Sequence, residues 1–442
     1  MFLQLAVMIA VIAIGSRKGG VAMGLWGAVG VFVLATVFRV APADTGGIVD
    51  VILIILAVIM AASAMEAAGG IEYLVSVAER IIRRHPSRVT LIAPVVSWAF
   101  TVGAGTAHVF YPLLPVIHDV SRQGGIRPER PLAVSSIAAT VGITASPVSA
   151  AMAAMIVLFE GDGWSLPKIM AVSVPATLLG VLVAALVQSR IGKPLDRDPE
   201  YRRRLAAGEI EEVAVAGSGG AQGAGRTLPE GARRSAYLFM AGTFAVVVTG
   251  LFPVLRPVAD DGSPIAMASM VEILMLGAGA LILMLCRVDA AKVPRTEAAR
   301  SGLVAVIGVF GLSWLGLTFI GAHQERITGA LGSVAEAHPW FFAVMLLLLS
   351  ALLFSQATTT KALMPLGIAL GIPAPLLIAM WPAVNGYFLL PAYGTFIAAM
   401  NFDRSGTTRI GRFVLNHSFM IPGLVATATA VGSGFALVGL VS

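Results

Sequence analysis

Long apolar runs separated by short polar stretches extend along nearly the whole chain. Runs such as VILIILAVIMAASAM and WFFAVMLLLLSALLF are typical of membrane-spanning helices, which need about 20 residues to cross a hydrocarbon core ~30 Å thick. Segments that alternate apolar and polar residues, as the strands of a membrane barrel do, are absent from the sequence. The pattern predicts an all-α polytopic membrane protein, with spans near 2–16, 19–38, 47–68, 131–158, 166–187, 236–254, 264–286, 302–320, 373–400 and 413–440.

Two further apolar segments, 89–117 and 339–367, are interrupted in the middle by Gly, Thr and Pro. The first contains TVGAGTAHVFYP, where Leu and Val would be typical of a plain span. Irregular backbone at membrane depth is stable only where protein or a water-filled cavity satisfies its N–H and C=O groups. We therefore expect re-entrant hairpins at these two segments and interrupted helices at 131–158 and 373–400.

The two interrupted segments match each other when the HP pairs at 85–86 and 338–339 are aligned. Residues then pair without a gap as Thr106 with Thr359, His108 with Lys361, and Pro112 with Pro365. After a shorter loop the pairs continue as Pro131 with Pro375, Gly142 with Gly386, and Pro147 with Pro391. Interrupted segments at equivalent places in two halves point to a transporter's binding site. The pairing predicts an N-terminal repeat at 1–200, a linker at 201–235 and a C-terminal repeat at 236–442.

The distribution of basic residues predicts the topology. If the N-terminus is outside and both hairpins return to the side they entered, 25 of the 30 Lys and Arg lie in loops on one side. Cytoplasmic loops carry such an excess. Each half then has five crossings and one hairpin, so the halves are inverted and both termini are periplasmic. SVAERIIRR and RITGALGSVAEA are interpreted as short amphipathic helices at the membrane surface.

Composition supports a membrane protein and narrows its partners. The chain is 57% hydrophobic and 12% charged, whereas soluble domains are about 25% charged. Its net charge of +6 does not indicate a nucleic-acid partner, because basic residues between apolar spans report membrane orientation. The opening MFLQLAVMIAVIAIG lacks a basic region and a cleavage site, so we expect a retained first helix. The lone Cys286 excludes an intramolecular disulfide and argues against a Cys-rich metal site.

Known catalytic and nucleotide-binding motifs are missing from the sequence. It contains no HExxH, no GxSxG and no GxxxxGK[ST]. A secondary carrier that works by alternating access is therefore favoured over a membrane enzyme and over ATP-driven transport. No cofactor is expected. The coupling ion stays open between H⁺ and Na⁺, because hydroxyl and carbonyl groups alone can hold Na⁺.

Two stretches carry a family resemblance. HVFYPLLPVIHDVSRQGGIRPERPLAVSSIAATVGITASPVSAA and the C-terminal FDRSGTTRIGRFVLNHSFMIPGLV resemble the anaerobic C4-dicarboxylate transporter (Dcu) family of bacteria, and the resemblance runs nearly end to end. It implies exchange of fumarate, succinate, malate or aspartate across the bacterial inner membrane. It also implies an inverted-repeat fold like that of an ion-transporter superfamily, with an elevator-like motion.

The resemblance leaves the branch of the family and the partners open. RPERP and HVFY resemble the fumarate–succinate antiporter branch, whereas SQATTTKALMP resembles the aspartate-handling branch. The sequence has LPAYG where the family pattern is LPTYP, so a role of that Thr or Pro is not carried over. Members of the family can also be partners of a membrane sensor kinase, which the loop at 188–235 would contact. The spans outside the hairpins and interrupted helices would form a scaffold and a homodimer interface.

A C4-dicarboxylate is a short rod with a carboxylate at each end, so a site at the bilayer midplane needs hydrogen-bond donors for both ends. Hairpin tips and half-helix N-termini supply backbone N–H groups. Gly103 and Gly105 permit close approach of backbone to ligand. Hydroxyl, amide and basic side chains near the breaks complete the expected substrate site, and the candidates are Thr106, His108, Thr144, Ser146, Pro147, Ser149, Thr358, Thr359, Thr360, Lys361, Asn385, Tyr393 and Thr395.

Each candidate also has a structural interpretation. Ser and Thr in membrane helices commonly donate to the carbonyl four residues earlier. His108 can be a neutral histidine inside the bundle, and Lys361 can snorkel or pair. Because His108 and Lys361 occupy equivalent repeat positions, the sharper hypothesis gives each one carboxylate of the diacid. Glu66 is interpreted as an interfacial acid, RPERP as a loop that fixes the hairpin's exit, and DRSGTTRIGR as a cytoplasmic turn.

Overall fold

The structure is a computed structural model that describes residues 1–18, 21–210, 228–260, 262–353, 355–390, 393–411 and 415–441. Within these residues every regular element is a helix, and β-structure is limited to two isolated bridges. The GSGGAQGAG stretch of the predicted linker and Pro391, the repeat partner of Pro147, lie outside the described residues. In chain order the α-helices are α1 (Phe2–Lys18), α2 (Ala22–Thr36), α3 (Gly46–Ala67), α4 (Gly70–Arg84), α5 (Val89–Ala104), α6 (Leu113–Gln123), α7 (Glu129–Val141), α8 (Ala150–Phe159), α9 (Leu166–Gln188), α10 (Pro199–Ala206), α11 (Ala232–Leu251), α12 (Met267–Leu285), α13 (Glu297–Ala337), α14 (Phe341–Leu353), α15 (Gln356–Ala369), α16 (Ala374–Met380), α17 (Gly394–Phe402) and α18 (Met420–Val441).

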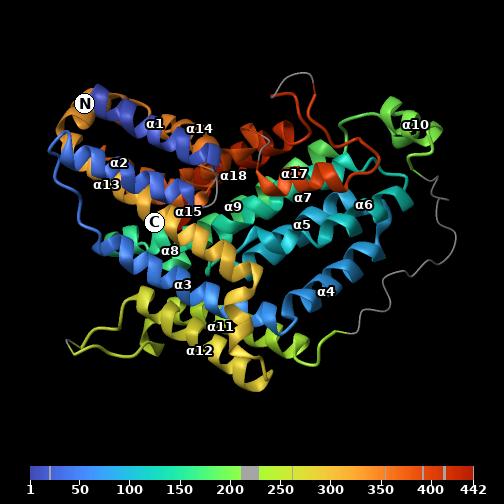
Figure 1. Cartoon of the computed structure of the whole chain (residues 1–442), viewed down its shortest axis with the longest axis horizontal. Coiled ribbons are helices and arrows are strands. Elements are labelled where there is room, and N and C mark those ends of the chain that lie inside the picture. Colours follow the sequence, from blue (N-terminus) through green and yellow to red (C-terminus); the bar gives the residue numbers. More distant parts are fainter. Residues whose placement is uncertain are drawn as a thin grey trace.

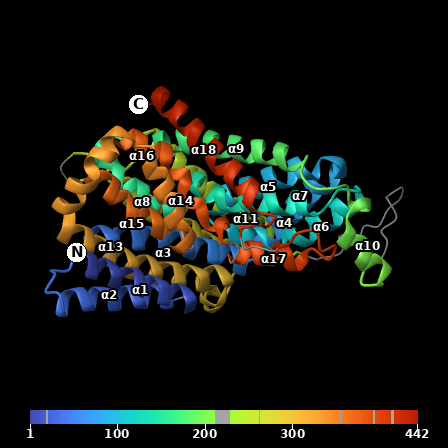
Figure 2. The same ribbon diagram turned by 90° about the horizontal axis from the view of Figure 1, so that it is seen from above.

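The helices lie side by side in an elongated bundle. Helices α1, α2 and α13 lie together at one end, and α4, α5, α6 and α10 lie toward the other (Figures 1 and 2). Pairs that pack along each other are α9 with α18, α2 with α13, α3 with α12, and α5 with α7. Small residues permit the closest of these approaches, since a Cβ built on Gly311 of α13 would lie 1.8 Å from the carbonyl oxygen of Gly24 on α2. Such contacts are typical of helices packed in a membrane.

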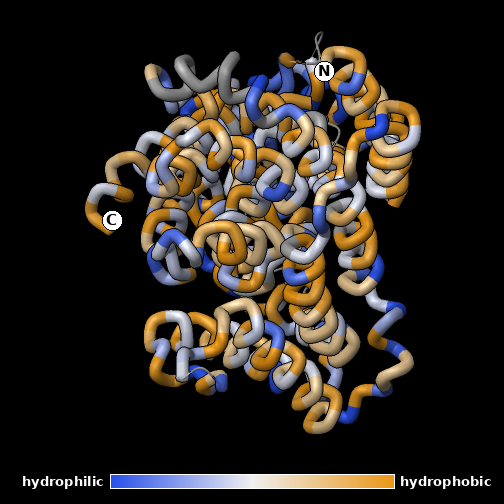
Figure 3. The backbone as a smooth tube through the Cα atoms, turned by 90° about the vertical axis from the view of Figure 1, so that its left-hand side faces the viewer, coloured by the Kyte–Doolittle hydropathy of each residue, from blue (hydrophilic) through white to orange (hydrophobic). Residues whose placement is uncertain are grey.

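The apolar helices identify a polytopic membrane protein. In the described residues, eight helices are long and apolar enough to cross a membrane, or nine when the bent pair Ala374–Leu389 and Gly394–Phe402 counts as one span. Hydrophobic colouring runs along the helices, and hydrophilic stretches gather at their ends and in loops (Figure 3). Two predicted spans fall short, because α1 and α2 have 17 and 15 residues. They are therefore roughly 22–26 Å long, less than the ~30 Å core.

The segment 89–117 consists of two helices, α5 and α6, joined by the short 3₁₀ helix η2 (Ala107–Phe110). Helix α5 ends at Gly105, which has a φ of 74° and donates its N–H to the carbonyl of Thr101 at 2.8 Å. A left-handed residue at this position is usually glycine, because a Cβ is disfavoured there. Thr106 then caps η2, and its Oγ1 accepts the N–H of His108 at 3.3 Å. TVGAGTAHVFYP is therefore the break itself.

The predicted interrupted helix at 131–158 is divided into α7, the short 3₁₀ helix η3 (Gly142–Ala145) and α8. Ser146 and Ser149 have extended backbone on either side of Pro147. The Oγ of Ser149 accepts the N–H of Met152 at 3.0 Å, so Ser149 caps α8. A helix that ends at a proline and restarts at a serine cap leaves a short irregular segment in the protein interior.

The C-terminal half has breaks at the corresponding places. Ser355 begins α15 after α14, and its Oγ accepts the N–H of Thr358 at 3.2 Å. Helix α16 continues into the 3₁₀ helix η8 (Trp381–Leu389), and the chain bends by 52° before α17. The structure is thus broken within all four segments where the sequence predicts interruptions.

Two predictions about element boundaries are wrong. RITGALGSVAEA is not a separate surface helix, because α13 continues through it from Glu297 to Ala337. The last span begins at Met420 rather than near 413. A β-bridge between Ile410 and His417 lies in the segments before this helix (403–411 and 415–419, called the polar loop), so these two residues are not part of it. SVAERIIRR does lie in a separate amphipathic helix, α4.

Substituting Gly105 with alanine is expected to destabilise the protein. A Cβ at this position would lie 2.9 Å from the carbonyl oxygen of Val148, and the left-handed backbone alone costs a non-glycine residue about 1–2 kcal/mol. Gly125 is the matched control, because its φ is 65° and nothing lies within 4 Å of its Cβ position. Thermal unfolding in detergent should show a larger loss for Gly105→Ala than for Gly125→Ala. Equal losses would contradict the close contact between the hairpin tip and the break at 146–149.

Candidate functional site

The break between α5 and α6, the tip of the predicted first hairpin, contacts both interrupted helices. The contact between Gly105 and the Val148 carbonyl joins the tip to the segment between α7 and α8. On the other side, a Cβ built on Gly394 would lie 2.6 Å from the hydroxyl of Tyr111, which places Tyr111 against the start of α17. The segment 105–111 therefore lies where the two interrupted helices approach each other.

The start of α15, in the predicted second hairpin, is joined to the same two helices by one side chain. The amide Nε2 of Gln356, the first residue of α15, donates to the carbonyl of Thr140 on α7 at 3.0 Å. It also donates to Oδ1 of Asn385 in η8 at 3.0 Å, and Asn385 Nδ2 donates to the carbonyl of Pro382 at 3.0 Å. Both amide side chains are buried. All four interrupted elements thus meet in one region, which we call the crossing (residues 105–111, 140–149, 355–361, 385–390 and 393–395).

Three hydroxyl groups around the crossing are buried without a hydrogen-bond partner in the described part of the chain: those of Thr101, Tyr387 and Thr395. Thr101 packs beside Gly142, and the ring of Tyr387 lies 4.9 Å from that of Tyr393. A buried polar group without a partner costs about 1–3 kcal/mol, so such groups are few in native structures and call for a ligand or water. These hydroxyls are therefore donors available to a polar ligand.

The predicted candidates on the first hairpin face helix α3. His108 is exposed and stacks on Tyr111, with ring centroids 5.8 Å apart. Thr106 and His108 line a cavity of about 130 Å³ whose other walls include Ile55 and Ala62 of α3. This cavity separates the break between α5 and α6 from α3.

The candidates on the first interrupted helix already make local hydrogen bonds. Thr144 Oγ1 donates to the carbonyl of Val141 at 2.8 Å. Ser149 caps α8, and the Oγ of Ser146 accepts the N–H of Val148 at 3.4 Å. Pro147 lies buried between the two serines. In this structure these side chains hold the shape of the break through local hydrogen bonds, although none of the three hydroxyl groups donates to the carbonyl four residues earlier.

The threonines of TTTK are also engaged within the protein. Thr358 Oγ1 donates to Ser355 Oγ at 2.9 Å, and Thr359 Oγ1 donates to the Ser355 carbonyl at 2.8 Å. Thr360 Oγ1 accepts the indole N–H of Trp381 at 2.9 Å. These bonds fix the start of α15 against η8, so the threonines position Gln356 at the crossing.

The structure does not bring Lys361 and His108 together. Lys361 is 6% exposed, and its ammonium donates to the carbonyl of Ile48 at the start of α3 at 3.3 Å. His108 faces α3 further along, between Ile55 and Ala62. At 1.5 Å per residue these levels of α3 are roughly 10–20 Å apart. Each basic group thus faces α3 at its own level.

Sequence reasoning missed Gln356 and Tyr387. Gln356 follows the Ser355 cap directly, and a glutamine at the break of an apolar segment is a signal that could have been used. Tyr387 follows two residues after the candidate Asn385 in a 3₁₀ segment, but nothing in the sequence predicts that its hydroxyl lacks a partner. Glu66, in contrast, accepts the backbone N–H groups of Glu297 and Ala298, which fits its interpretation as an interfacial acid.

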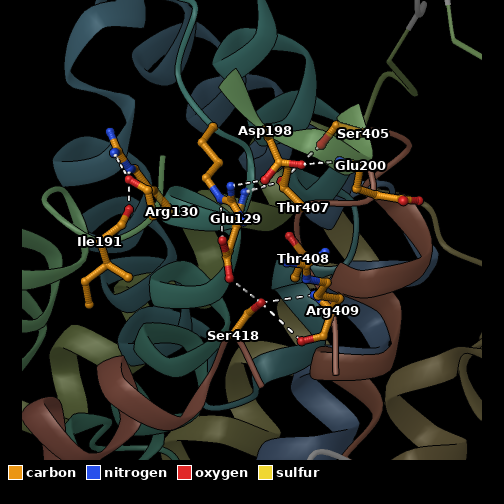
Figure 4. Close-up of polar contacts among 12 residues, drawn as sticks. Glu129, Arg130, Ile191, Asp198, Glu200, Ser405, Thr407, Thr408, Arg409 and Ser418 are labelled. Atoms are coloured by element: carbon orange, nitrogen blue, oxygen red, sulfur yellow. Dashed lines mark hydrogen bonds and ion pairs between the residues drawn. The ribbon is translucent and has the colours of Figure 1, made fainter. Parts of the chain in front are cut away.

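A second polar cluster lies outside the crossing, where RPERP meets the polar loop before α18 (Figure 4). The guanidinium of Arg127 binds the carboxylates of Glu129 and Asp198. Glu129 also accepts a hydrogen bond from the hydroxyl of Ser418 at 2.6 Å. Within the loop, Asp403 accepts hydrogen bonds from Ser405, Thr407 and Thr408. RPERP and DRSGTTRIGR therefore form one buried network that joins α7, α10 and the loop.

Comparison with known proteins gives the family. A family model described as an anaerobic C4-dicarboxylate membrane transporter matches residues 1–442. The chain is 37% identical over 438 residues to the anaerobic C4-dicarboxylate transporter DcuB of Escherichia coli O6:H1, covering 98% of this chain and 97% of that protein. It is 38% identical to the C4-dicarboxylate transporter DcuA of Escherichia coli K12 over 444 residues and to that of Wolinella succinogenes over 433 residues, with 98% of each chain covered.

These relatives are transporters and not enzymes. Together with the eight helices of the described residues that are apolar enough to span a membrane, the match makes the chain a multi-pass protein of the inner membrane. The chain therefore belongs to the family of anaerobic C4-dicarboxylate membrane transporters.

Proposed function

We propose that the chain is a secondary carrier that exchanges C4-dicarboxylates such as fumarate, succinate, malate and aspartate by alternating access, and that the substrate binds at the crossing. The family gives the substrate class. The observation that carries the site is the meeting of four interrupted elements around buried hydroxyls that have no partner among the described residues. Backbone N–H groups at broken helix ends can bind carboxylates without burying a large positive charge.

We further propose two inverted halves, 1–200 and 236–442, with 89–117 and 339–367 as re-entrant hairpins. The support is that both segments break near matched positions: Thr106 caps the element after the first break, and Ser355 caps the element after the second, four residues before Thr359, the repeat partner of Thr106. In the interrupted helices that follow the hairpins, the backbone dihedral angles are no longer helical at Ser146 and at Asn385. Paired breaks of this kind are expected where a transporter holds its substrate.

The hairpins and interrupted helices are proposed to move together past a scaffold that includes α3. Two features lie on this boundary: the cavity between His108 and α3, and the bond from Lys361 to the Ile48 carbonyl. A single hydrogen bond to a backbone carbonyl can be exchanged for another during such a movement, and the mobile body then carries its substrate across the membrane in an elevator-like manner.

Counterflow in proteoliposomes tests the proposed function. Purified protein is reconstituted with unlabelled succinate inside, and radiolabelled fumarate is added outside without ATP. We expect labelled fumarate to accumulate transiently only when dicarboxylate is present inside. Liposomes that accumulate no label, or that convert fumarate chemically, would refute exchange by this chain.

The two basic candidates give a graded prediction. Lys361→Ala is expected to reduce exchange about tenfold or more, because a charge-assisted hydrogen bond is worth about 1.5–3 kcal/mol and 1.4 kcal/mol corresponds to a factor of ten. His108→Ala is expected to change affinity less, since the ring is exposed and stacked on Tyr111. Lys168→Ala, at an exposed lysine near Trp164, is the control for loss of a basic group. Near-normal affinity in both variants would leave the hydroxyls and backbone as the binding groups.

Site-directed cysteine labelling tests the proposed topology in a Cys286→Ser background. Arg83→Cys and Arg203→Cys are expected to react with a membrane-impermeant maleimide only from the cytoplasmic side, and Lys168→Cys only from the periplasmic side. A cysteine added after Ser442 should react from the periplasm. A cytoplasmic C-terminus, or labelling of Arg83→Cys and Arg203→Cys from opposite sides, would exclude inverted halves of five crossings each.

A further inference from the structure

A cavity of about 600 Å³ lies away from the crossing, beside the second polar cluster. Its walls come from the start of α7, the end of α9 and the polar loop before α18. The polar side chains that line it are those of Arg127, Glu129, Gln188, Arg409, Asn416, His417 and Ser418. None of these residues belongs to the crossing. The volume corresponds to on the order of 20 water molecules at ~30 Å³ each, ample for a four-carbon diacid and its hydration.

The acidic side chain of this cavity, Glu129, already has a hydrogen-bond donor on each carboxylate oxygen. Glu129 receives hydrogen bonds from Arg127 and from Ser418, one on each carboxylate oxygen. The guanidinium of Arg127 also forms an ion pair with the carboxylate of Asp198. The wall formed by these residues is therefore fixed, and it does not attract a further cation.

Other side chains that line the cavity lack a partner among the described residues, and one of them is His417, whose buried Nε2 makes no hydrogen bond there. Gln188, the last residue of α9, is 2% exposed, and its Oε1 has no hydrogen-bond partner in the described residues. Arg409 is exposed, and its guanidinium makes no ion pair with any residue that the structure describes. The backbone of Arg409 is nevertheless held in place, because its N–H donates to Ser418 Oγ at 3.0 Å and its carbonyl accepts the Ser418 N–H at 3.1 Å.

We propose that this cavity is a second binding site for a small dicarboxylate, separate from the crossing and on the face that carries the arginine-rich loops. Arg409 binds one carboxylate through its guanidinium fork. The Gln188 amide binds the far end of the ligand, since a terminal amide can present either its oxygen or its N–H groups. The ligand class rests on the proposed function, whereas the location rests on the cavity and its unsatisfied groups.

Equilibrium binding of radiolabelled succinate to the purified full chain in detergent tests this proposal. We expect two equivalents of succinate per chain in the unmodified protein. Arg409→Gln and Gln188→Leu should each weaken one of the two sites at least tenfold and leave the other. Arg404→Gln is the matched control, because Arg404 lies in the same loop but does not line this cavity.

The outcomes separate this site from the crossing. Gln356→Ala, at the crossing, should weaken only the site that Arg409→Gln spares. If succinate binds at one site per chain and Arg409→Gln leaves it intact, the second site does not exist. If inorganic phosphate displaces succinate from the Arg409-dependent site as well as malate does, the site takes any anion and the assignment to dicarboxylates is wrong. Failure of counterflow with an intact Arg409-dependent site would instead refute the proposed function alone.

Discussion

Replacing Gln356 with alanine is expected to lower dicarboxylate exchange at least about tenfold while the protein still folds. The substitution removes both hydrogen bonds from Nε2, to the Thr140 carbonyl and to Asn385 Oδ1. An acceptor left buried without its donor costs about 1–3 kcal/mol, and 1.4 kcal/mol corresponds to a factor of ten. The start of α15 then loses its fixed position against both interrupted helices. Initial rates of exchange in proteoliposomes, normalised to reconstituted protein, measure the effect.

A double-mutant cycle with Asn385→Ala is the control for this prediction. Gln356 and Asn385 act through a shared hydrogen bond, so the double variant should lose less than the sum of the two single losses. Folding is monitored by the monodispersity of each variant in size-exclusion chromatography. Wild-type exchange by Gln356→Ala, or strictly additive losses, would show that the bond does not organise the crossing.

Replacing Arg127 with alanine is expected to have the largest effect on stability, a loss of about 3–5 kcal/mol. Arg127 is buried between Glu129 and Asp198, and removing one partner of a buried ion pair leaves uncompensated charge in the interior. Arg203→Ala is the matched control, since Arg203 is 57% exposed in its pair with Glu200 and an exposed pair is worth about 0–1 kcal/mol. Unfolding in mild detergent at pH 7 measures both.

The pH dependence of this loss follows from Asp198. Burial raises the pKa of Asp198, but hydrogen bonds from the Tyr201 N–H and the charge of Arg127 outweigh it, so the folded-state pKa lies below the usual value. A carboxylate with a lowered folded pKa contributes stability above its unfolded pKa of about 4, and that contribution is lost as the pH falls through the folded pKa. The difference between Arg127→Ala and the unmodified protein should therefore shrink below about pH 4. An equal difference at pH 7 and at pH 3 would contradict the ion pair as its cause.

The interruptions could be predicted from the sequence because their causes are local. Gly105 permits the left-handed end of α5, and Pro147 with the Ser149 cap divides α7 from α8. The start of α18 was placed too early because the stretch before Met420 is itself apolar in part. The β-bridge between Ile410 and His417 pairs two nearby residues before the helix, and hydropathy alone does not predict such a pairing.

The side-chain contacts of the site could not be predicted, because they join residues far apart in the sequence. Gln356 and its acceptor Thr140 are separated by 216 positions, and no periodic pattern reports such a pair. The same holds for Arg127 and Asp198, which are 71 positions apart. The matched repeat positions predict that His108 and Lys361 act together. In this structure, however, the two side chains contact different turns of α3. Equivalence in a repeat predicts similar environments and does not by itself predict proximity.

The location of bound substrate tests the central claim most directly. A crystal structure of the chain with 2-bromosuccinate, in which anomalous scattering identifies the bromine, would place the ligand without relying on its shape. We expect a bromine peak at the crossing, within contact distance of Gln356, Tyr387 or the 105–111 tip, in addition to any peak near Arg409. A fully occupied ligand near Arg409 together with an empty crossing would contradict the account.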